Sequence, residues 1–393
     1  MKKLIFNFFR KNVVPKLYYI SFSIISLLPK DEKLVIFESF LGKQFSDNPR
    51  AIYEYMSKHF PDYKLYWSFN KSIAKQHAQV KSINRLSFKW LLYMGRAKYW
   101  ITNSRLPLWI PKPKSTIYVQ TWHGTPLKKL GVDIEDVKMP GTTTLQYKHN
   151  FTKEASKWDY LVSPNRYSTD IFRRAFHFDQ EIIEVGYPRN DCLINSKDNT
   201  GERLTKLGLP QNKKVILYAP TWRDNQYFSR GKYSFNLELD LDNLNKELGD
   251  EFIVLLRMHY LVSENLNIDK YKGFVYDFSS YSDISDLYLI SDLLITDYSS
   301  VFFDYANLRR PIIFFVYDLE AYRQELRGFY LDFEQIAPGP LIQDNDQLLK
   351  ELKQIDFNRY SPPEKYEAFI TEFCSLENGR ATAQVVDTIL HNK

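Results

Sequence analysis

Short, almost continuously apolar runs alternate with stretches of helical period along this chain, and this alternation restricts the folds open to it. Apolar runs of about four to eight residues have the length of buried strands. Strands that are apolar on both sides are typical of a parallel sheet covered by helices on both faces. The runs lie at residues 33–40, 65–69, 99–103, 115–121, 160–163 and 181–186, and again at 214–219, 252–257, 274–276, 293–297 and 311–315.

A break in this rhythm predicts two domains. Residues 195–213 are polar, and the alternation restarts after them. The length of 393 residues agrees, since domains usually hold roughly 100–200 residues. We expect an α/β protein with two Rossmann-like, doubly wound sheets, at residues 31–200 and 201–393, whose last helix is able to cross back. Ligands bind beyond the carboxyl ends of such strands, so the cleft between the domains is the expected site.

The first 30 residues form a separate, basic and apolar segment. They hold six Lys and Arg residues and no acid, which equals the net charge of +6 of the whole chain. The uncharged run from Leu17 to Leu28 is shorter than the roughly 20 residues of a spanning helix. We interpret residues 1–30 as an amphipathic segment that binds an anionic membrane surface. A helix packed on the protein itself is the alternative, followed by a signal peptide or a span.

Several chemistries lack their usual signatures in this sequence. The two cysteines, Cys192 and Cys374, form no disulfide framework, which favours the cytosol. No Gly-x-Gly, phosphate-loop, Cys-x-x-Cys or His-Glu-x-x-His motif occurs. The triplets Asp240–Asp242 and Asp344–Asp346 lie in polar stretches, where we interpret them as turns or helix caps and not as metal ligands. No basic stripe follows the N-terminal segment, which argues against nucleic-acid binding.

His123 stands out in the first half, where a predicted strand gives way to a loop. A histidine in this position titrates near neutral pH and is suited to act as a general base. Gly124 permits close approach of the backbone, and Lys128 is suited to attract an anionic acceptor. The alternative is a buried, hydrogen-bonded histidine beside Trp122.

Cationic residues follow two predicted strands of the second half. Arg223 emerges just past one strand, which suits bidentate binding of phosphate. Arg257 and His259 emerge from the next strand and are two residues apart, so they lie on one side and suit a diphosphate. The alternatives are an arginine stacked on Trp222 and a simple salt bridge.

The segment from Thr296 to Tyr305 carries hydroxyls and acids after a further strand. Ser299 and Ser300, with the free amides of a helix start, form a candidate anion site. Asp297 or Asp304 is placed to orient a histidine or to accept from hydroxyls. Ordinary helix capping is the alternative.

Together these motifs resemble the CDP-glycerol glycerophosphotransferase family, the teichoic acid primases and polymerases of Gram-positive bacteria. The resemblance covers about residues 33–390, and the motifs stand in family order. They are Phe37–Phe40, Ser46–Arg50, Thr121–Lys129, Tyr218–Arg223, Leu256–His259, Thr296–Tyr305, Arg327–Phe333 and Pro338–Pro340.

The resemblance implies a GT-B fold with an acceptor domain at 31–200 and a CDP-glycerol donor domain at 201–393. It implies transfer of glycerol phosphate from CDP-glycerol to an undecaprenyl-diphosphate-linked saccharide or glycerol-phosphate acceptor, with release of CMP. It further implies peripheral attachment to the cytoplasmic face of the membrane and no metal or other cofactor. Carried over by motif, His123 is the base, His259 and Asp304 join it in the catalytic group, and the substrate contacts are Arg223, Arg257, Asp297, Ser299, Ser300, Lys128 and Arg327.

Several alternatives remain open at this point. The length suits a primase or a short-chain extender, since long polymerases of the family carry an extra domain. A CDP-ribitol-using relative and a capsule-decorating enzyme fit the same phosphate motifs. A GT-B glycosyltransferase using a nucleotide sugar is the competing enzyme class, and a membrane-tethered binding protein with a decayed site is the non-enzyme reading. The oligomeric state is left open.

Overall fold

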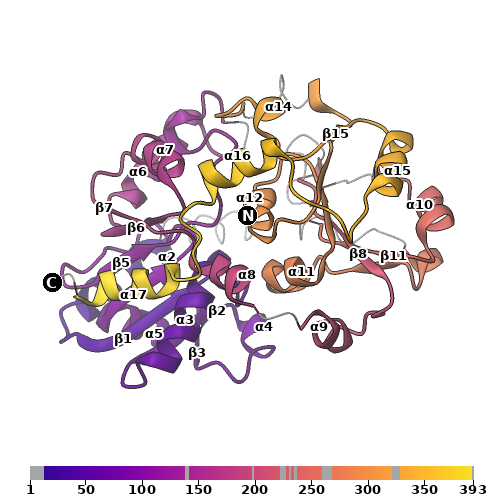
Figure 1. Ribbon diagram of the computed structural model, residues 1–393. Coiled ribbons are helices and arrows are strands. Elements are labelled where there is room, and N and C mark those ends of the chain that lie inside the picture. The colour runs from indigo at the N-terminus through magenta and orange to yellow at the C-terminus, as the bar shows by residue number, and fades with distance from the viewer. Residues whose placement is uncertain are drawn as a thin grey trace. The chain divides into compact units, whose positions relative to one another are not determined.

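The chain is divided into two compact units. The computed structural model describes residues 13–137, 141–196, 199–221, 227–229, 232–233, 237–258, 268–320 and 328–391 (Figure 1). The first unit consists of Met1–His123, Leu130–Asp191 and Arg380–Lys393, and the second of Gly124–Lys129 and Cys192–Gly379. The division therefore passes through the His123 motif, and it falls again just before the polar stretch at 195–213.

The first unit is built on a sheet of seven strands in the order β3-β2-β1-β4-β5-β6-β7, with every neighbouring pair parallel. The chain starts at β1, builds outward to β3 and then returns to β4 beside β1. This reversal of direction leaves a crevice at the carboxyl ends of β1 and β4, where ligands bind in sheets of this type. The strands are β1 Asp31–Glu38, β2 Lys64–Phe69, β3 Ser82–Asn84, β4 Ala97–Thr102, β5 Ile117–Gln120, β6 Tyr160–Ser163 and β7 Glu181–Glu184.

Helices cover both faces of the first sheet because its strands are apolar on both sides. On one face, α3 (Asp47–His59) and α17 (Ala381–His391) pack Ile52 and Val385 into the core, and Figure 1 shows these two helices side by side. On the other face, Trp100 of β4 meets Phe22 of α2 (Val14–Ile25). The remaining helices are α4 Lys71–Ala74, α5 Phe88–Arg96, α6 Thr144–Ala155 and α7 Arg166–Phe176.

The second unit repeats the design with a parallel six-stranded sheet in the order β12-β11-β8-β13-β14-β15. Here the direction reverses between β8 and β13. The strands are β8 Lys214–Tyr218, β11 Phe252–Leu256, β12 Val275–Asp277, β13 Leu293–Thr296, β14 Ile312–Phe315 and β15 Leu341–Ile342, with a separate hairpin of β9 Tyr227–Ser229 and β10 Lys232–Tyr233. The helices are α8 Asp191–Asn195, which begins at the unit boundary, α9 Thr200–Lys206, α10 Leu241–Leu248, α11 Ile284–Ile290, α12 Val301–Tyr305, α14 Phe333–Ile336, α15 Asn345–Gln354 and α16 Glu364–Phe373.

Two parallel α/β sheets confirm the predicted fold class, and every strand expected from an apolar run is present. The sequence did not predict β3, β15 or the hairpin, because strands of two or three residues are too short to show a pattern. Helix α3 begins at Asp47, and Ser46 is the residue at its N-cap position. Asp240 and Asp344 cap α10 and α15 by accepting from backbone amides, which confirms that they are caps.

Helix α2 combines a packed face with an exposed apolar face. Phe22 and Ile25 are buried, whereas Leu17, Ile20 and Ile24 are more than half exposed. The packing contacts are those expected of a helix that docks on its own protein, and residues 1–12 of the predicted segment lie outside the described residues. Within the described part of the chain, no helix combines the length and the apolarity that crossing a membrane requires.

Gly131 allows the loop after the His123 motif to approach α7. Its φ of +51° favours glycine, and a Cβ at this position would overlap the carbonyl oxygen of Ala175. We expect Gly131→Ala to lower the free energy of unfolding by about 3–5 kcal/mol, since the overlap involves backbone. Gly208→Ala is the matched control, because Gly208 has a φ of +70° and nothing within 4 Å of the added Cβ.

Gly208→Ala should lower the free energy of unfolding by only about 1–2 kcal/mol, which is the cost of the left-handed backbone conformation alone. Urea or thermal unfolding measures both variants. Equal losses in the two variants would contradict the close approach at Gly131.

Candidate functional site

A strained turn after β5 presents His123. The preceding residue, Trp122, has a φ of +52°, which is rare for a bulky side chain and costs about 1–3 kcal/mol. Two contacts hold the turn: the Trp122 amide donates to Oε1 of Gln120 at 3.0 Å, and the indole packs on Phe176 with ring centroids 4.6 Å apart. Strain of this kind is found where a side chain must be aimed.

The contacts of His123 determine which ring nitrogen carries the proton. Nδ1 lies 2.7 Å from the backbone oxygen of Asn103. A carbonyl oxygen only accepts, so Nδ1 is the protonated nitrogen and the neutral ring has its lone pair on Nε2. The ring stacks on Trp122 at 4.6 Å and meets the Phe40 ring at 63°. These contacts orient the ring, and part of the residue stays open to solvent.

The surroundings of His123 favour its neutral form. Desolvation by the dense protein around the ring lowers the pKa of His123 below its ordinary value of 6.5. The negative charge of Asp47 and the bond to Asn103 act against this, and Arg189 and Arg105 lower the pKa further. A neutral imidazole with a free lone pair on Nε2 can take a proton at neutral pH.

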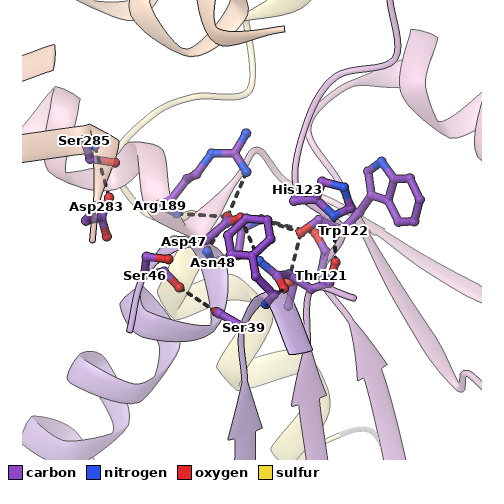
Figure 2. Close-up of polar contacts among 12 residues, drawn as sticks. Ser39, Ser46, Asp47, Asn48, Thr121, Trp122, His123, Arg189, Asp283 and Ser285 are labelled. Carbon is purple, nitrogen blue, oxygen red and sulfur yellow. Dashed lines mark hydrogen bonds and ion pairs between the residues drawn. The ribbon is translucent and has the colours of Figure 1, made fainter. Parts of the chain in front are cut away.

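A buried polar network lies next to this histidine at the carboxyl edge of the first sheet, as Figure 2 shows. Asp47 pairs with Arg189 at 2.8 Å and accepts from the Asn103 amide at 2.8 Å. Asn48 donates to the carbonyls of the two residues before His123. None of these residues was predicted from the sequence to be a site residue, although Asp47 and Asn48 lie in the family motif Ser46–Arg50.

The reversal point of the second sheet is closed by bonds between β8 and β13. Asp297 accepts from the backbone amide of Thr221 at 2.7 Å, and Thr296 donates to the carbonyl of Ala219 at 2.7 Å. Both bonds fix the turn that leaves β8. The structure therefore gives Asp297 a role in shaping this turn, which the sequence did not predict.

Part of the His123 motif belongs to the second unit and lies against the Ser299–Ser300 turn. Gly124 is so close to Ser300 that a Cβ would come within 2.8 Å of its hydroxyl. Lys128 pairs with Phe329 in a short antiparallel bridge, and the amide of Tyr330 donates to the carbonyl of Leu127. The motif Thr121–Lys129 thus lies beside the motifs Thr296–Tyr305 and Arg327–Phe333 in this unit, although about 170 to 200 residues separate them in the sequence.

The other predicted residues of the second unit divide into described and undescribed ones. Ser299 is half-buried in the same turn, and Asp304 is buried within the short helix α12. Arg257 donates through Nη1 to the carbonyls of Phe278 and Ser279 at 2.8 and 2.7 Å, and burial lowers its pKa. Its guanidinium therefore anchors the loop after β12. Outside the described residues lie Arg223, His259 and Arg327.

Metal-binding side chains do not gather in the described residues. No three His, Cys, Asp or Glu side chains of this part of the chain are close enough together to hold a metal ion.

Residues 20–391 match the family described as CDP-glycerol:poly(glycerophosphate) glycerophosphotransferase. The chain belongs to this family. The resemblance found in the sequence motifs is thereby confirmed over nearly the whole length.

Relatives with related names share much of the sequence. The chain is 56% identical over 388 residues to a teichoic acid poly(glycerol phosphate) polymerase of Bacillus spizizenii, covering 97% of this chain and 98% of that protein. It is 49% identical to a teichoic acid glycerol-phosphate transferase of Staphylococcus aureus, covering 96% and 99%. A polymerase of the same name from Bacillus subtilis is 56% identical, and the chain spans only about half, 52%, of its length.

Solved structures agree with the fold of this family. The wall teichoic acid polymerase TagF, in a histidine-to-asparagine variant soaked with CDPG, superposes with a TM-score of 0.88 at 46% identity, covering 97% of this chain and 95% of that one. A UDP-GlcNAc 2-epimerase of Neisseria meningitidis, at 14% identity and a TM-score of 0.52, shares the fold alone. These likenesses support the GT-B-like class for the two parallel-sheet units.

The environment of His123 predicts a lowered pKa, which can be measured without any substrate. We expect its NMR titration midpoint to lie below 6.5, because desolvation disfavours the charged ring. Below that midpoint the ring is protonated and cannot act as a base; above it Nε2 is free to accept. The His123→Gln variant identifies the resonance, and a midpoint above 6.5 would contradict the neutral form described above.

Proposed function

We propose that this chain transfers glycerol phosphate from CDP-glycerol to a lipid-linked acceptor during wall teichoic acid synthesis and releases CMP. The observation that carries the proposal is His123, a histidine of the family motif whose protonated Nδ1 leaves the lone pair of Nε2 available. The names of the relatives, at 49–56% identity, supply the substrate class.

The proposed reaction is a displacement at phosphorus. Nε2 of His123 takes the proton of an acceptor hydroxyl, and that oxygen attacks the phosphorus that bears the glycerol. The bond between this phosphorus and the bridging oxygen of the diphosphate breaks, and the electron pair leaves with CMP. Charge develops on the phosphoryl oxygens and the leaving group, so hydrogen-bond donors and cations aimed at them lower the barrier.

The donor side of the site is assigned to the second unit. Ser299 and Ser300 are the described candidates for the diphosphate, because their turn follows β13 at the reversal point of the sheet. His123 directly precedes Gly124, which contacts Ser300, so the chain itself links base and turn. Lys128, Arg223, His259, Asp304 and Arg327 stay predictions from the family motifs.

Arg257 acts indirectly in this proposal. Its bonds to Phe278 and Ser279 hold the loop at the carboxyl end of β12, where a donor would be met. Asp297 likewise shapes the turn after β8. We propose a positioning role for both, and their direct contacts with the substrate stay predictions from the family motifs.

Chain elongation is favoured over priming. Three poly(glycerol phosphate) polymerases are 48–56% identical to this chain, whereas the glycerol-phosphate primases are 28–30% identical and a poly(ribitol-phosphate) polymerase is 32% identical. The acceptor is then a lipid-linked saccharide that already carries glycerol phosphate. A glycosyltransferase reading has support only from the fold.

The transfer is proposed to need no metal ion and to occur at the cytoplasmic membrane surface. Four exposed residues of the N-terminal region, Leu17, Ile20, Ile24 and Leu27, recur at the spacing of one helical face. The six basic residues of the first 30 add attraction to anionic lipid.

An assay with defined donors tests the activity. With CDP-glycerol, a lipid acceptor carrying one glycerol phosphate, and EDTA, we expect CMP and a ladder of products that grow by glycerol phosphate units. We expect His123→Ala to lower kcat by about 10²–10⁴-fold, the usual contribution of a general base. Its affinity for CDP-glycerol should stay within a few fold of wild type.

Other outcomes would each remove one part of the proposal. A single added unit would indicate a short-chain extender and not a polymerase, transfer from CDP-ribitol would change the donor, and transfer from a UDP sugar would favour the glycosyltransferase. A wild-type rate in His123→Ala would remove the base, and loss of activity in EDTA would overturn metal independence.

A liposome assay tests the membrane face. We expect the double variant Ile20→Ser/Ile24→Ser to bind phosphatidylglycerol vesicles at least about tenfold more weakly, since burying one such side chain contributes about 1.5–3 kcal/mol. Leu145→Ser is the matched control, because Leu145 is 81% exposed on α6. Equal binding by both variants would favour a helix that serves only to pack on the protein.

A further inference from the structure

Asp47 is a buried carboxylate whose two oxygens are both engaged. Oδ1 lies 2.8 Å from Nη1 of Arg189 and accepts from the Asn48 amide at 2.6 Å. Oδ2 accepts from the side-chain amide of Asn103 at 2.8 Å. The residue is 8% exposed, and its φ of +66° lies in the left-handed region. A buried ion pair adds little net stability, and a strained backbone conformation costs free energy. This combination indicates that Asp47 has a role beyond stability.

One arm of the network leads from Asp47 to His123. The Asn103 side chain is clamped, because its Nδ2 donates to Asp47 and its Oδ1 accepts from the Phe40 amide at 2.8 Å. The backbone oxygen of the same Asn103 accepts a hydrogen bond from His123 Nδ1. Only one residue therefore separates the carboxylate from the histidine.

A second arm holds the backbone that carries the histidine. Asn48, next to Asp47, donates to the carbonyls of Thr121 and Trp122 at 3.2 and 3.3 Å. The side-chain oxygen of Asn48, Oδ1, accepts from the backbone amide of Arg189 at 3.1 Å. Two residues at the start of α3 thus support His123. Asn48 holds the backbone after β5, as the bonds drawn in Figure 2 illustrate, and Asp47 acts on the Nδ1 side of the imidazole through Asn103.

We propose that Asp47 and Arg189 are positioning residues for His123: Asp47 orients the imidazole through Asn103 and stabilises its protonated form, and Arg189 limits that effect. The inference rests on the proposed role of His123 as the base. When Nε2 takes a proton the ring becomes cationic, and a nearby negative charge lowers the energy of that state. The charged groups that act on the ring are Asp47, Arg189 and Arg105.

The pair makes a prediction with opposite signs for its two members. Asp47 raises the pKa of His123 and Arg189 lowers it. Asp47→Asn should therefore move the NMR midpoint of His123, and the acidic limb of kcat/KM, to lower pH. Arg189→Gln should move both to higher pH. Two residues that served only to hold the fold would not shift the midpoint in opposite directions.

The turnover of the variants completes the test. We expect Asp47→Asn to lower kcat by about ten- to a hundredfold, the range found for outer partners of a functional histidine. The KM for CDP-glycerol should not change, because the proposed effect of Asp47 is on the base and not on the donor. The double variant Asp47→Asn/Arg189→Gln removes both charges and keeps the measurement possible where the single variant fails to fold.

Glu38→Gln is the matched control. Glu38 is 2% exposed at the same sheet edge, pairs with Arg85 at 3.1 Å and accepts from Ser68 at 2.6 Å. Within the described residues it has no bond to Asn103 or His123. Its loss should lower stability and leave the midpoint of His123 where it is in the wild type.

Two results would overturn the inference. The first is a folded Asp47→Asn variant with the wild-type midpoint, and the second is a shift of both single variants in the same direction. If His123→Ala is inactive in these cases, the proposed function stands and only the role of Asp47 falls. If His123→Ala keeps the wild-type rate, both fall.

Discussion

The hydrogen bond from His123 Nδ1 to the backbone oxygen of Asn103 is the contact on which the proposed role of His123 depends. It assigns the proton to one nitrogen and leaves the other with a lone pair. Backbone oxygens do not titrate, so the neutral ring keeps this tautomer at every pH above its titration midpoint. Three other features contribute to the orientation of the imidazole. They are the strained turn at Trp122, the rings that contact the imidazole and the buried network around Asp47.

Both sheets place their functional residues by the same topological rule. In each sheet the chain reverses direction beside its first strand, at β1 and β4 in one unit and at β8 and β13 in the other. The carboxyl ends of these strands carry Asn103 and the Asp297–Ser300 turn. Polar side chains are needed there because neighbouring strands separate and leave backbone groups to be satisfied.

The sequence predicted the fold because most strands are continuous apolar runs, and it made His123 a candidate because a histidine at a strand end is conspicuous. It could not predict the network, since Asp47 lies 56 residues from Asn103 and 142 from Arg189 and they meet only in the folded sheet. Asn103 is the last residue of a predicted strand, and a polar side chain at that position was a usable signal. For Arg257 the pattern gave the place but not the partner, which proved to be backbone carbonyls.

The last helix has a consequence for how the protein is made. The chain leaves the first unit after Asp191 and returns at Arg380, and the Asp191 carboxylate accepts from the first two amides of α17. Val385 and Ile389 of that helix fill the core beneath the first sheet. During synthesis, which proceeds from the N-terminus, the second unit is therefore complete before the first. The apolar face that α17 covers in the first unit therefore stays exposed until residues 381–391 have left the ribosome.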